Sequence, residues 1–182
     1  CQTRSNIRST SAVGCFRRPR RWRAANPSRP FHVIQVSRPA LGPEELAAVG
    51  QVFDTGWLGL GSTTYAFEQA LSAMLGGRQV IAVNTGTAAL HLALASLRLA
   101  PGDEVILPSI TFAASVQPVL AAGGTPVFCE SREADLLIDL DDVEQRLTSR
   151  TRAIMPVHYC GQPCDMDRLS ALAGARGITI VE

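Results

Sequence analysis

From residue 79 onward, short runs of β-branched and apolar residues alternate with longer segments rich in helix formers. The short runs predict buried strands, because they combine Val, Ile and Thr with glycine, proline or polar residues at their ends. We expect strands at residues 80–83, 104–107, 125–129, 153–158 and 178–181. Helices are expected at residues 43–54, 64–75, 88–97, 113–122, 140–147 and 166–173.

Strands that alternate with helices across short links predict an α/β fold with three layers, in which a mostly parallel sheet has helices on both faces. In such sheets ligands bind outside the carboxyl ends of the strands. Three groups of side chains fall at these ends: Thr85-Gly86-Thr87, Ser109-Ile110-Thr111-Phe112 and His158-Tyr159. We therefore expect them to share one site.

The first group has the features of a phosphate site. The first N–H groups of a helix lack partners within the helix, and the helix dipole is positive there. Gly86 has no Cβ to keep a ligand from the backbone, and Thr85 and Thr87 add hydroxyl groups. The alternative is that Thr85 only caps the helix and Gly86 only turns the chain.

Two readings also stay open for each of the other candidates. Phe112 is placed either to cover a flat ligand or to fill the core. His158 either orients a ligand group or is a neutral histidine hydrogen-bonded at a strand end. His91 lies in the middle of a helix among Leu and Ala and is interpreted as structural.

Composition and charge divide the chain unevenly. The chain has 182 residues, of which 46% are hydrophobic, and a net charge of +1. Residues 1–30 hold eight arginines and no acid, whereas the remainder holds nine arginines against sixteen acids. All seventeen basic residues are arginine, so the sequence contains no lysine. No apolar run has the ~20 residues of a membrane helix, so we expect no contact with a membrane.

Residues 1–30 are predicted to be a disordered basic extension, and residues 31–182 the folded part. Three functions compete for the extension: nucleic-acid binding, an organelle transit peptide and a twin-arginine signal. A non-native or upstream-translated extension is a further interpretation. The five cysteines are odd in number and complete no zinc set, which favours reduced thiols in a cytoplasmic protein and no metal.

Five blocks of sequence resemble a known family. They are GWLGLG at 56–61, NTGTAALHLAL at 84–94, PGDEVILPSITFAAS at 101–115, GGTPVF at 123–128 and PVHYCGQPCDMD at 156–167. In this order and spacing they look like the nucleotide-sugar aminotransferases of DegT/StrS type. The resemblance implies a pyridoxal phosphate (PLP) enzyme with the aspartate-aminotransferase fold, of which residues 31–182 are the N-terminal part of the large domain.

The resemblance also implies roles for single residues. Gly86, Thr87 and Ala88 match the phosphate-binding turn, and Phe112 matches the aromatic residue that stacks on the pyridine ring. His158 matches a histidine that supports the cofactor site, and Trp57 lies in the loop near the sugar-nucleotide entrance. The family's Schiff-base lysine and ring-nitrogen aspartate would lie beyond Glu182, so we expect the chain alone to be inactive and to bind PLP weakly.

The activity implied for the intact protein is transfer of an amino group from an amino acid, glutamate being the expected donor, to a keto sugar on a nucleotide. A homodimer is implied as well. Two other classes stay open: a PLP-dependent sugar dehydratase of the same family, and a non-enzymatic module that binds a nucleotide or nucleic acid. We expect no nucleic-acid partner, because such a module leaves the matched loops unexplained.

Overall fold

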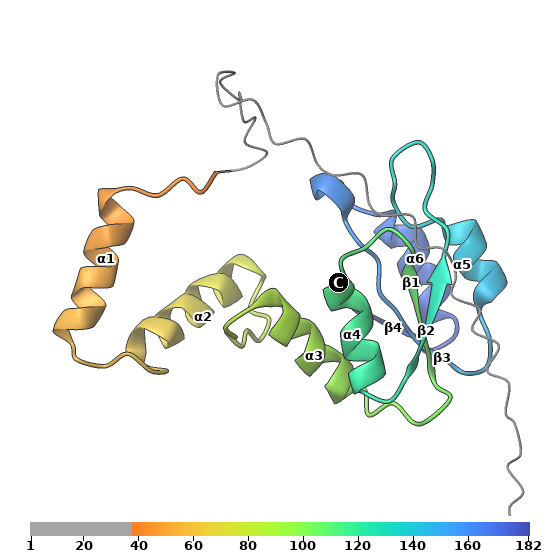
Figure 1. Ribbon diagram of the computed structural model, residues 1–182, viewed down its shortest axis with the longest axis horizontal. Coiled ribbons are helices and arrows are strands. Elements are labelled where there is room, and N and C mark those ends of the chain that lie inside the picture. The colour runs from red at the N-terminus through yellow and green to blue at the C-terminus, as the bar shows by residue number, and fades with distance from the viewer. Residues whose placement is uncertain (1–37) are drawn as a thin grey trace, which may run out of the picture. The chain divides into compact units, whose positions relative to one another are not determined.

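Figure 1 shows the computed structural model of the chain, which describes residues 38–182. The predicted basic extension and the predicted start of the folded part at residue 31 lie outside the described residues. The described residues fall into two units, residues 38–54 and residues 55–182. In the first unit the structure describes helix α1 (Pro43–Asp54), whose first turn holds a proline and two glutamates that suit a helix start.

The second unit contains the remaining elements. Its helices are α2 (Ser62–Met74), α3 (Gly86–Ser96), α4 (Ala113–Ala121), α5 (Leu140–Arg146), the 3-10 turn η1 (Tyr159–Gly161) and α6 (Met166–Gly174). Its strands are β1 (Glu104–Pro108), β2 (Thr125–Cys129), β3 (Thr151–Ile154) and β4 (Thr179–Ile180). The α-helices and the strands β1, β2 and β4 lie close to their predicted positions, whereas residues 159–161, predicted as a loop, form a short 3-10 turn. None of the helices within residues 38–182 is long and apolar enough to cross a membrane.

The four strands form one parallel sheet in the order β2-β1-β3-β4. β1 lies at its centre, with Ile106 opposite Val127 on one side and Ile154 on the other. Every residue of β1 is buried, as expected for a strand that is covered on both faces. The predicted parallel sheet is therefore confirmed.

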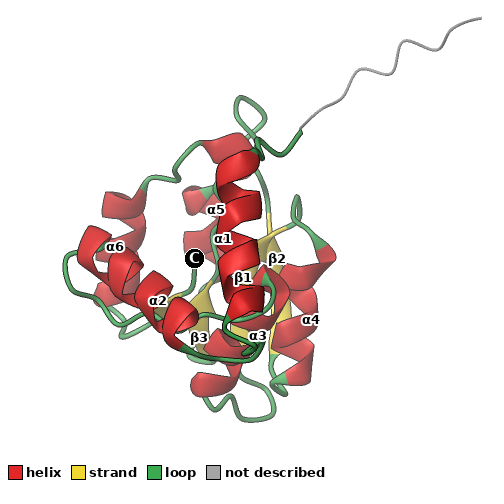
Figure 2. Ribbon diagram, turned by 90° about the vertical axis from the view of Figure 1, so that its left-hand side faces the viewer, coloured by secondary structure: helices red, strands yellow, loops and turns green. Residues whose placement is uncertain are grey.

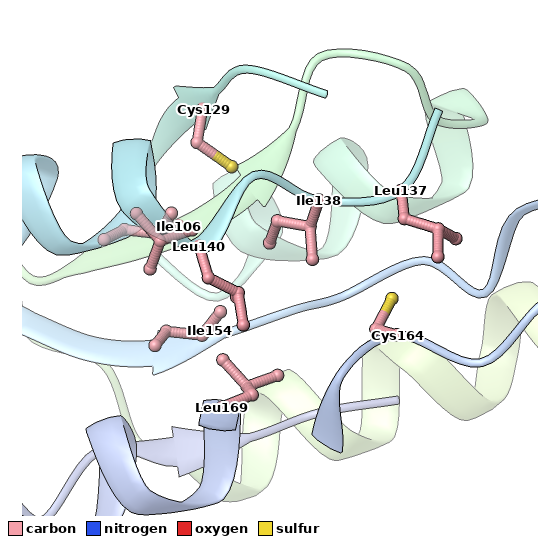
Figure 3. Close-up of a cluster of buried hydrophobic side chains, with 9 residues drawn as sticks. Ile106, Cys129, Leu137, Ile138, Leu140, Ile154, Cys164 and Leu169 are labelled. Atoms are coloured by element: carbon pink, nitrogen blue, oxygen red, sulfur yellow. The ribbon is translucent and has the colours of Figure 1, made fainter. Parts of the chain in front are cut away.

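Alternate residues of β1 point into two cores on opposite faces of the sheet. Val105 and Leu107 pack with Leu94 of α3 and Val119 of α4. Ile106 packs on the other face with α5 and α6, in the cluster drawn in Figure 3. Figure 1 shows α4 and α5 on opposite sides of the strands. The three-layer prediction is confirmed, since helices cover both faces.

The first predicted strand is not formed. Residues 79–83 are assigned neither helix nor strand, and the side chain of Ile81 is 80% exposed instead of buried. The N–H of Ala82 donates to Glu68 Oε1 at 2.8 Å, not to a strand. The prediction was wrong here because a strand needs a hydrogen-bonded neighbour, and none of the four strands pairs with this segment.

The fourth predicted strand is shorter than expected. It ends at Ile154 instead of residue 158, although Met155 still donates its N–H to Ile106 O at 2.8 Å. Pro156 has no N–H to continue the ladder, so pairing stops there. Residues 155–158 consequently leave the sheet as a connecting segment that carries His158 beyond its edge.

Candidate functional site

The start of α3 is capped by its own sequence. Thr85 has extended backbone angles, and its Oγ1 accepts a hydrogen bond from the N–H of Ala88 at 3.0 Å. This is the usual arrangement of a threonine N-cap. The capping role considered for Thr85 is confirmed, and it occupies the N–H of Ala88.

The two N–H groups before Ala88 remain available. Among residues 38–182, no hydrogen-bond partner is found for the N–H of Gly86 or of Thr87. A Cβ at Gly86 would meet no atom within 4 Å, so the space in front of it is open. Two donors at the positive end of a helix, facing open space, form a place where an anion can bind.

Phe112 lies at the end of the loop that follows β1. It is the N-cap residue of α4, and its carbonyl accepts the N–H of Ser115 at 2.9 Å. Its side chain is 78% exposed, which rules out the core position considered for it. Thr111 Oγ1 donates to the buried Ser115 Oγ at 2.8 Å, which fixes the loop against the first turn of α4.

An open pocket of about 660 Å³ joins these two helix starts. Its volume is within the usual range for sites of small organic ligands. Figure 1 marks the C-terminus beside the start of α4, and Glu182, the residue there, shares the pocket with Phe112. The pocket is lined by Gly86, Thr87, Ala89, Leu90, Ala93, Phe112, Ala114, Ser115 and Glu182.

Sequence reasoning identified three of these residues, Gly86, Thr87 and Phe112, and missed the others, among them the two polar residues Ser115 and Glu182. The signal for Glu182 was present, because it follows β4 at the carboxyl edge of the sheet, where ligands of such folds bind. Ser115 gave no signal, since a serine in the first turn of a helix is common. Ala88 does not line this pocket; it lines a second hollow with Leu60, Asn84 and His91, on α3 and the segment before it.

His158 does not line the pocket, and two hydrogen bonds hold its ring. Its Nδ1 accepts the N–H of Cys164 at 3.0 Å, and its Nε2 is 2.9 Å from Glu182 Oε2. Since a backbone N–H only donates, Nδ1 must be bare and the proton of the neutral ring is on Nε2, facing the carboxylate. The hydrogen-bonded histidine considered for this position is confirmed.

Trp57 is the one predicted site residue that folds onto its own loop. Its Nε1 donates to Leu60 O at 2.7 Å, and a Cβ at Gly61 would lie 2.7 Å from Trp57 Cδ1. Gly61 is therefore needed for this close contact. The ring remains 64% exposed and is absent from the lining of the pocket at Phe112.

Two of the described cysteines, Cys129 and Cys164, are buried and are poor nucleophiles. Burial raises the pKa of the Cys129 thiol to about 12 and also raises the pKa of Cys164. Cys164 donates its S–H to Val157 O at 3.3 Å. Within residues 38–182 no group of three or more metal-binding side chains comes together. The chemistry of the pocket thus rests on amides, hydroxyls, an aromatic ring and one carboxylate.

The chain is similar to known proteins over most of its length. The profile of the DegT/DnrJ/EryC1/StrS aminotransferase family matches residues 39–182. The aminotransferase TlmJ from Streptoalloteichus hindustanus is 41% identical with a TM-score of 0.79, over 82% of this chain and 42% of that one. Spr1654 from Streptococcus pneumoniae, a candidate sugar aminotransferase solved in its PLP form, is 34% identical with a TM-score of 0.75, over 80% and 38%.

A third solved structure belongs to a different reaction class. It is the GDP-4-keto-6-deoxy-D-mannose-3-dehydratase from E. coli with bound hydrated PLP. It is 25% identical with a TM-score of 0.75, and the match covers 79% of this chain and 39% of that one. The chain thus spans about two fifths of the length of these three solved proteins.

Proposed function

The chain belongs to the DegT/DnrJ/EryC1/StrS aminotransferase family, and on this premise we propose that its pocket holds PLP for the transfer of an amino group to a sugar. One observation carries the proposal: the unpartnered N–H groups of Gly86 and Thr87 share an open pocket with the exposed ring of Phe112. The PLP form of Spr1654 and the PLP of the E. coli dehydratase support it.

The residues present fit the cofactor. Gly86 leaves room for a phosphate in front of two free amides, and the Thr87 hydroxyl is the side-chain donor beside them. Phe112 offers an exposed aromatic face to a flat ring. PLP, when bound, supplies an electron sink that makes exchange of an amino group possible. The residues of this chain then act by binding and orienting it, with Ala88 supporting the turn through its bond to Thr85.

The finer features of the function belong to the same proposal. The acceptor would be a nucleotide-linked keto sugar and the donor an amino acid, with glutamate expected. Trp57, exposed on a loop held by its own hydrogen bond, would face the sugar nucleotide. Residues 31–182 would form the N-terminal part of the large domain of a cytoplasmic homodimer.

A sugar dehydratase is the second candidate, and the match to the E. coli dehydratase favours it. The pocket residues serve either reaction, because both need the cofactor held in the same way. The two are separated by supplying the intact protein with a nucleotide-linked keto sugar and glutamate. A sugar product that has gained the nitrogen of glutamate indicates the aminotransferase, and a product that has lost a hydroxyl group without gaining nitrogen indicates the dehydratase.

We predict that Phe112→Ala weakens PLP binding to the 182-residue chain by about three- to tenfold, since an aromatic pair contributes about 0.5–1.5 kcal/mol beyond its buried area. The chain should stay folded, because the ring is 78% exposed. The measurement is a titration with PLP followed by NMR. Phe67→Ala is the matched control, since Phe67 is 57% exposed and is absent from the pocket lining.

Equal affinities of the wild type and Phe112→Ala would contradict the proposal. Because the sequence holds no lysine, we also propose that this chain binds PLP without a covalent bond. A stable absorption band of the kind that PLP shows when it is covalently bonded to an amine, measured on the purified chain, would refute this second proposal.

A further inference from the structure

We infer that His158 is a positioning residue, which holds the end of β4 at the pocket through Glu182 and does not touch the cofactor itself. The inference rests on the proposed function and states how His158 supports the site, namely through its hydrogen bond to Glu182. It starts from the observation that Glu182 lines the pocket, whereas His158 is absent from its lining.

Within residues 38–182, few other contacts hold the end of β4. The strand has only two residues, and it pairs with β3 alone, through Thr179 and Ile180. Beyond it the N–H of Val181 donates to Ile154 O at 3.0 Å. The one side-chain bond of Glu182 among the described residues is the contact of its Oε2 with His158 Nε2 at 2.9 Å. Among the described residues, His158 is therefore the side chain that holds the Glu182 carboxylate in place.

The imidazole is in turn fixed from the other side. The N–H of Cys164 donates to Nδ1 at 3.0 Å, just before α6. Cys164 is itself buried in the core cluster with Leu169 and Ile138 (Figure 3). A rigid core residue thus sets the orientation and tautomer of His158, and His158 presents its Nε2 proton to the carboxylate of Glu182.

This geometry distinguishes positioning from direct contact. If His158 acts through Glu182, removing either side chain breaks the same hydrogen bond, and removing both costs no more than removing one. If His158 touches the cofactor itself, removing His158 and removing Glu182 act separately, and their effects multiply in the double variant. Glu182→Gln keeps a carbonyl oxygen that can accept from Nε2, so it should behave almost like the wild type.

The test is a double-mutant cycle on PLP affinity, measured by NMR titration of the full chain. We expect His158→Ala and Glu182→Ala each to weaken binding by about three- to tenfold, the range of one net hydrogen bond, and the double variant to match the single ones. Gln162→Ala, in the exposed loop beside His158, is the control. Nitrogen NMR of the His158 ring should show the proton on Nε2 and a bare Nδ1.

Three outcomes overturn the inference while PLP still binds to the wild type. They are an unchanged affinity in Glu182→Ala, effects that multiply in the double variant, and a proton on Nδ1. A wild-type chain that binds no PLP overturns the proposed function and this role together. If His158→Ala does not fold, Glu182→Ala alone decides, because its side chain is 53% exposed at the end of the strand.

Discussion

At the scale of single residues, Glu104 shows how the sheet is held at the edge opposite to the pocket. Its side chain is buried at the start of β1. Thr148 donates its hydroxyl to Oε2 at 2.5 Å, and Arg150 donates to Oε1 through Nε and Nη2 at 2.9 and 2.5 Å. Together they tie β1 to the loop before β3. These partners, the Thr148 hydroxyl foremost, hold the pKa of Glu104 below its usual value of 4.5 despite burial.

We predict that Glu104→Gln lowers the free energy of unfolding at neutral pH by about 1–3 kcal/mol, because it weakens charge-assisted hydrogen bonds to a buried group. A lowered pKa means that this stability is present above the unfolded pKa and is lost as pH falls through the folded pKa. The difference between wild type and variant should therefore shrink below about pH 4.5. Denaturant unfolding between pH 3 and 7 measures it.

Glu133→Gln is the control for this prediction, since Glu133 is exposed and no hydrogen bond of its side chain is found among the described residues. A Glu104→Gln difference that stays constant down to pH 3, or that is no larger than the control, would show that the buried carboxylate does not stabilise the sheet.

At the scale of elements, α3 is the helix on which the site depends. It packs through Leu94 into the core below and presents its first turn to the pocket. The Thr85 cap fixes the start of α3. The Thr85 hydroxyl therefore also determines where the N–H groups of Gly86 and Thr87 lie. A change that destabilises the start of α3 should therefore also disorder the anion site.

We predict that Thr85→Ala lowers the free energy of unfolding by about 1 kcal/mol, the usual cost of a lost N-cap. Thr85→Ser keeps the hydroxyl and should cost only a few tenths of that. Amide hydrogen exchange gives a local readout, because the N–H of Ala88 loses its acceptor and should exchange faster in Thr85→Ala. If Ala88 exchanges at the same rate in both variants, the cap does not order this turn.

Elements with strong periodicity could be predicted from the sequence, and those that depend on distant partners could not. α4 and β1 were predicted within a residue of their observed ends, because Pro101-Gly102 and Gly123-Gly124 bound them. The segment 79–83 has the composition of a buried strand, but pairing is a property of its neighbours and not of its own residues. The pocket could be predicted from Gly86, which begins α3, and from Phe112, which is the N-cap of α4, because both were expected at one edge of the sheet.

The contact of His158 with Glu182 was beyond sequence reasoning. The two residues are 24 positions apart, and only the parallel placement of β3 and β4 brings them together. The resemblance to the family indicated that His158 supports the site but gave no partner for it. A hydrogen bond between loops follows from the sheet register, which periodicity alone does not supply.

At the scale of the whole molecule, the described residues leave many large apolar side chains in solvent. Ile81, Leu60 and Phe112 in the second unit are 80%, 80% and 78% exposed, and Leu46 of α1 is 74% exposed. Exposed apolar surface of this kind favours association. The chain spans about two fifths of the solved proteins that it matches.

We predict that the 182-residue chain self-associates at micromolar concentration, with a mass that rises as the concentration rises. Analytical ultracentrifugation over a hundredfold concentration range measures this directly. Ile81→Lys, which places a charge on the exposed segment, should reduce the association. A chain that stays monomeric throughout and melts cooperatively would contradict the prediction.

The central claim is that the amides of Gly86 and Thr87 bind the phosphate of PLP. Its most direct test is an amide NMR titration with PLP and with pyridoxal, which lacks the phosphate, on the wild type and on Gly86→Ala. Gly174→Ala is the matched control, because a Cβ there also meets no atom within 4 Å. The account predicts that PLP shifts the Gly86 and Thr87 amides far more than pyridoxal does, and that Gly86→Ala alone weakens PLP binding by about tenfold. PLP that binds equally well to Gly86→Ala, or that leaves these two amides unshifted, would contradict it.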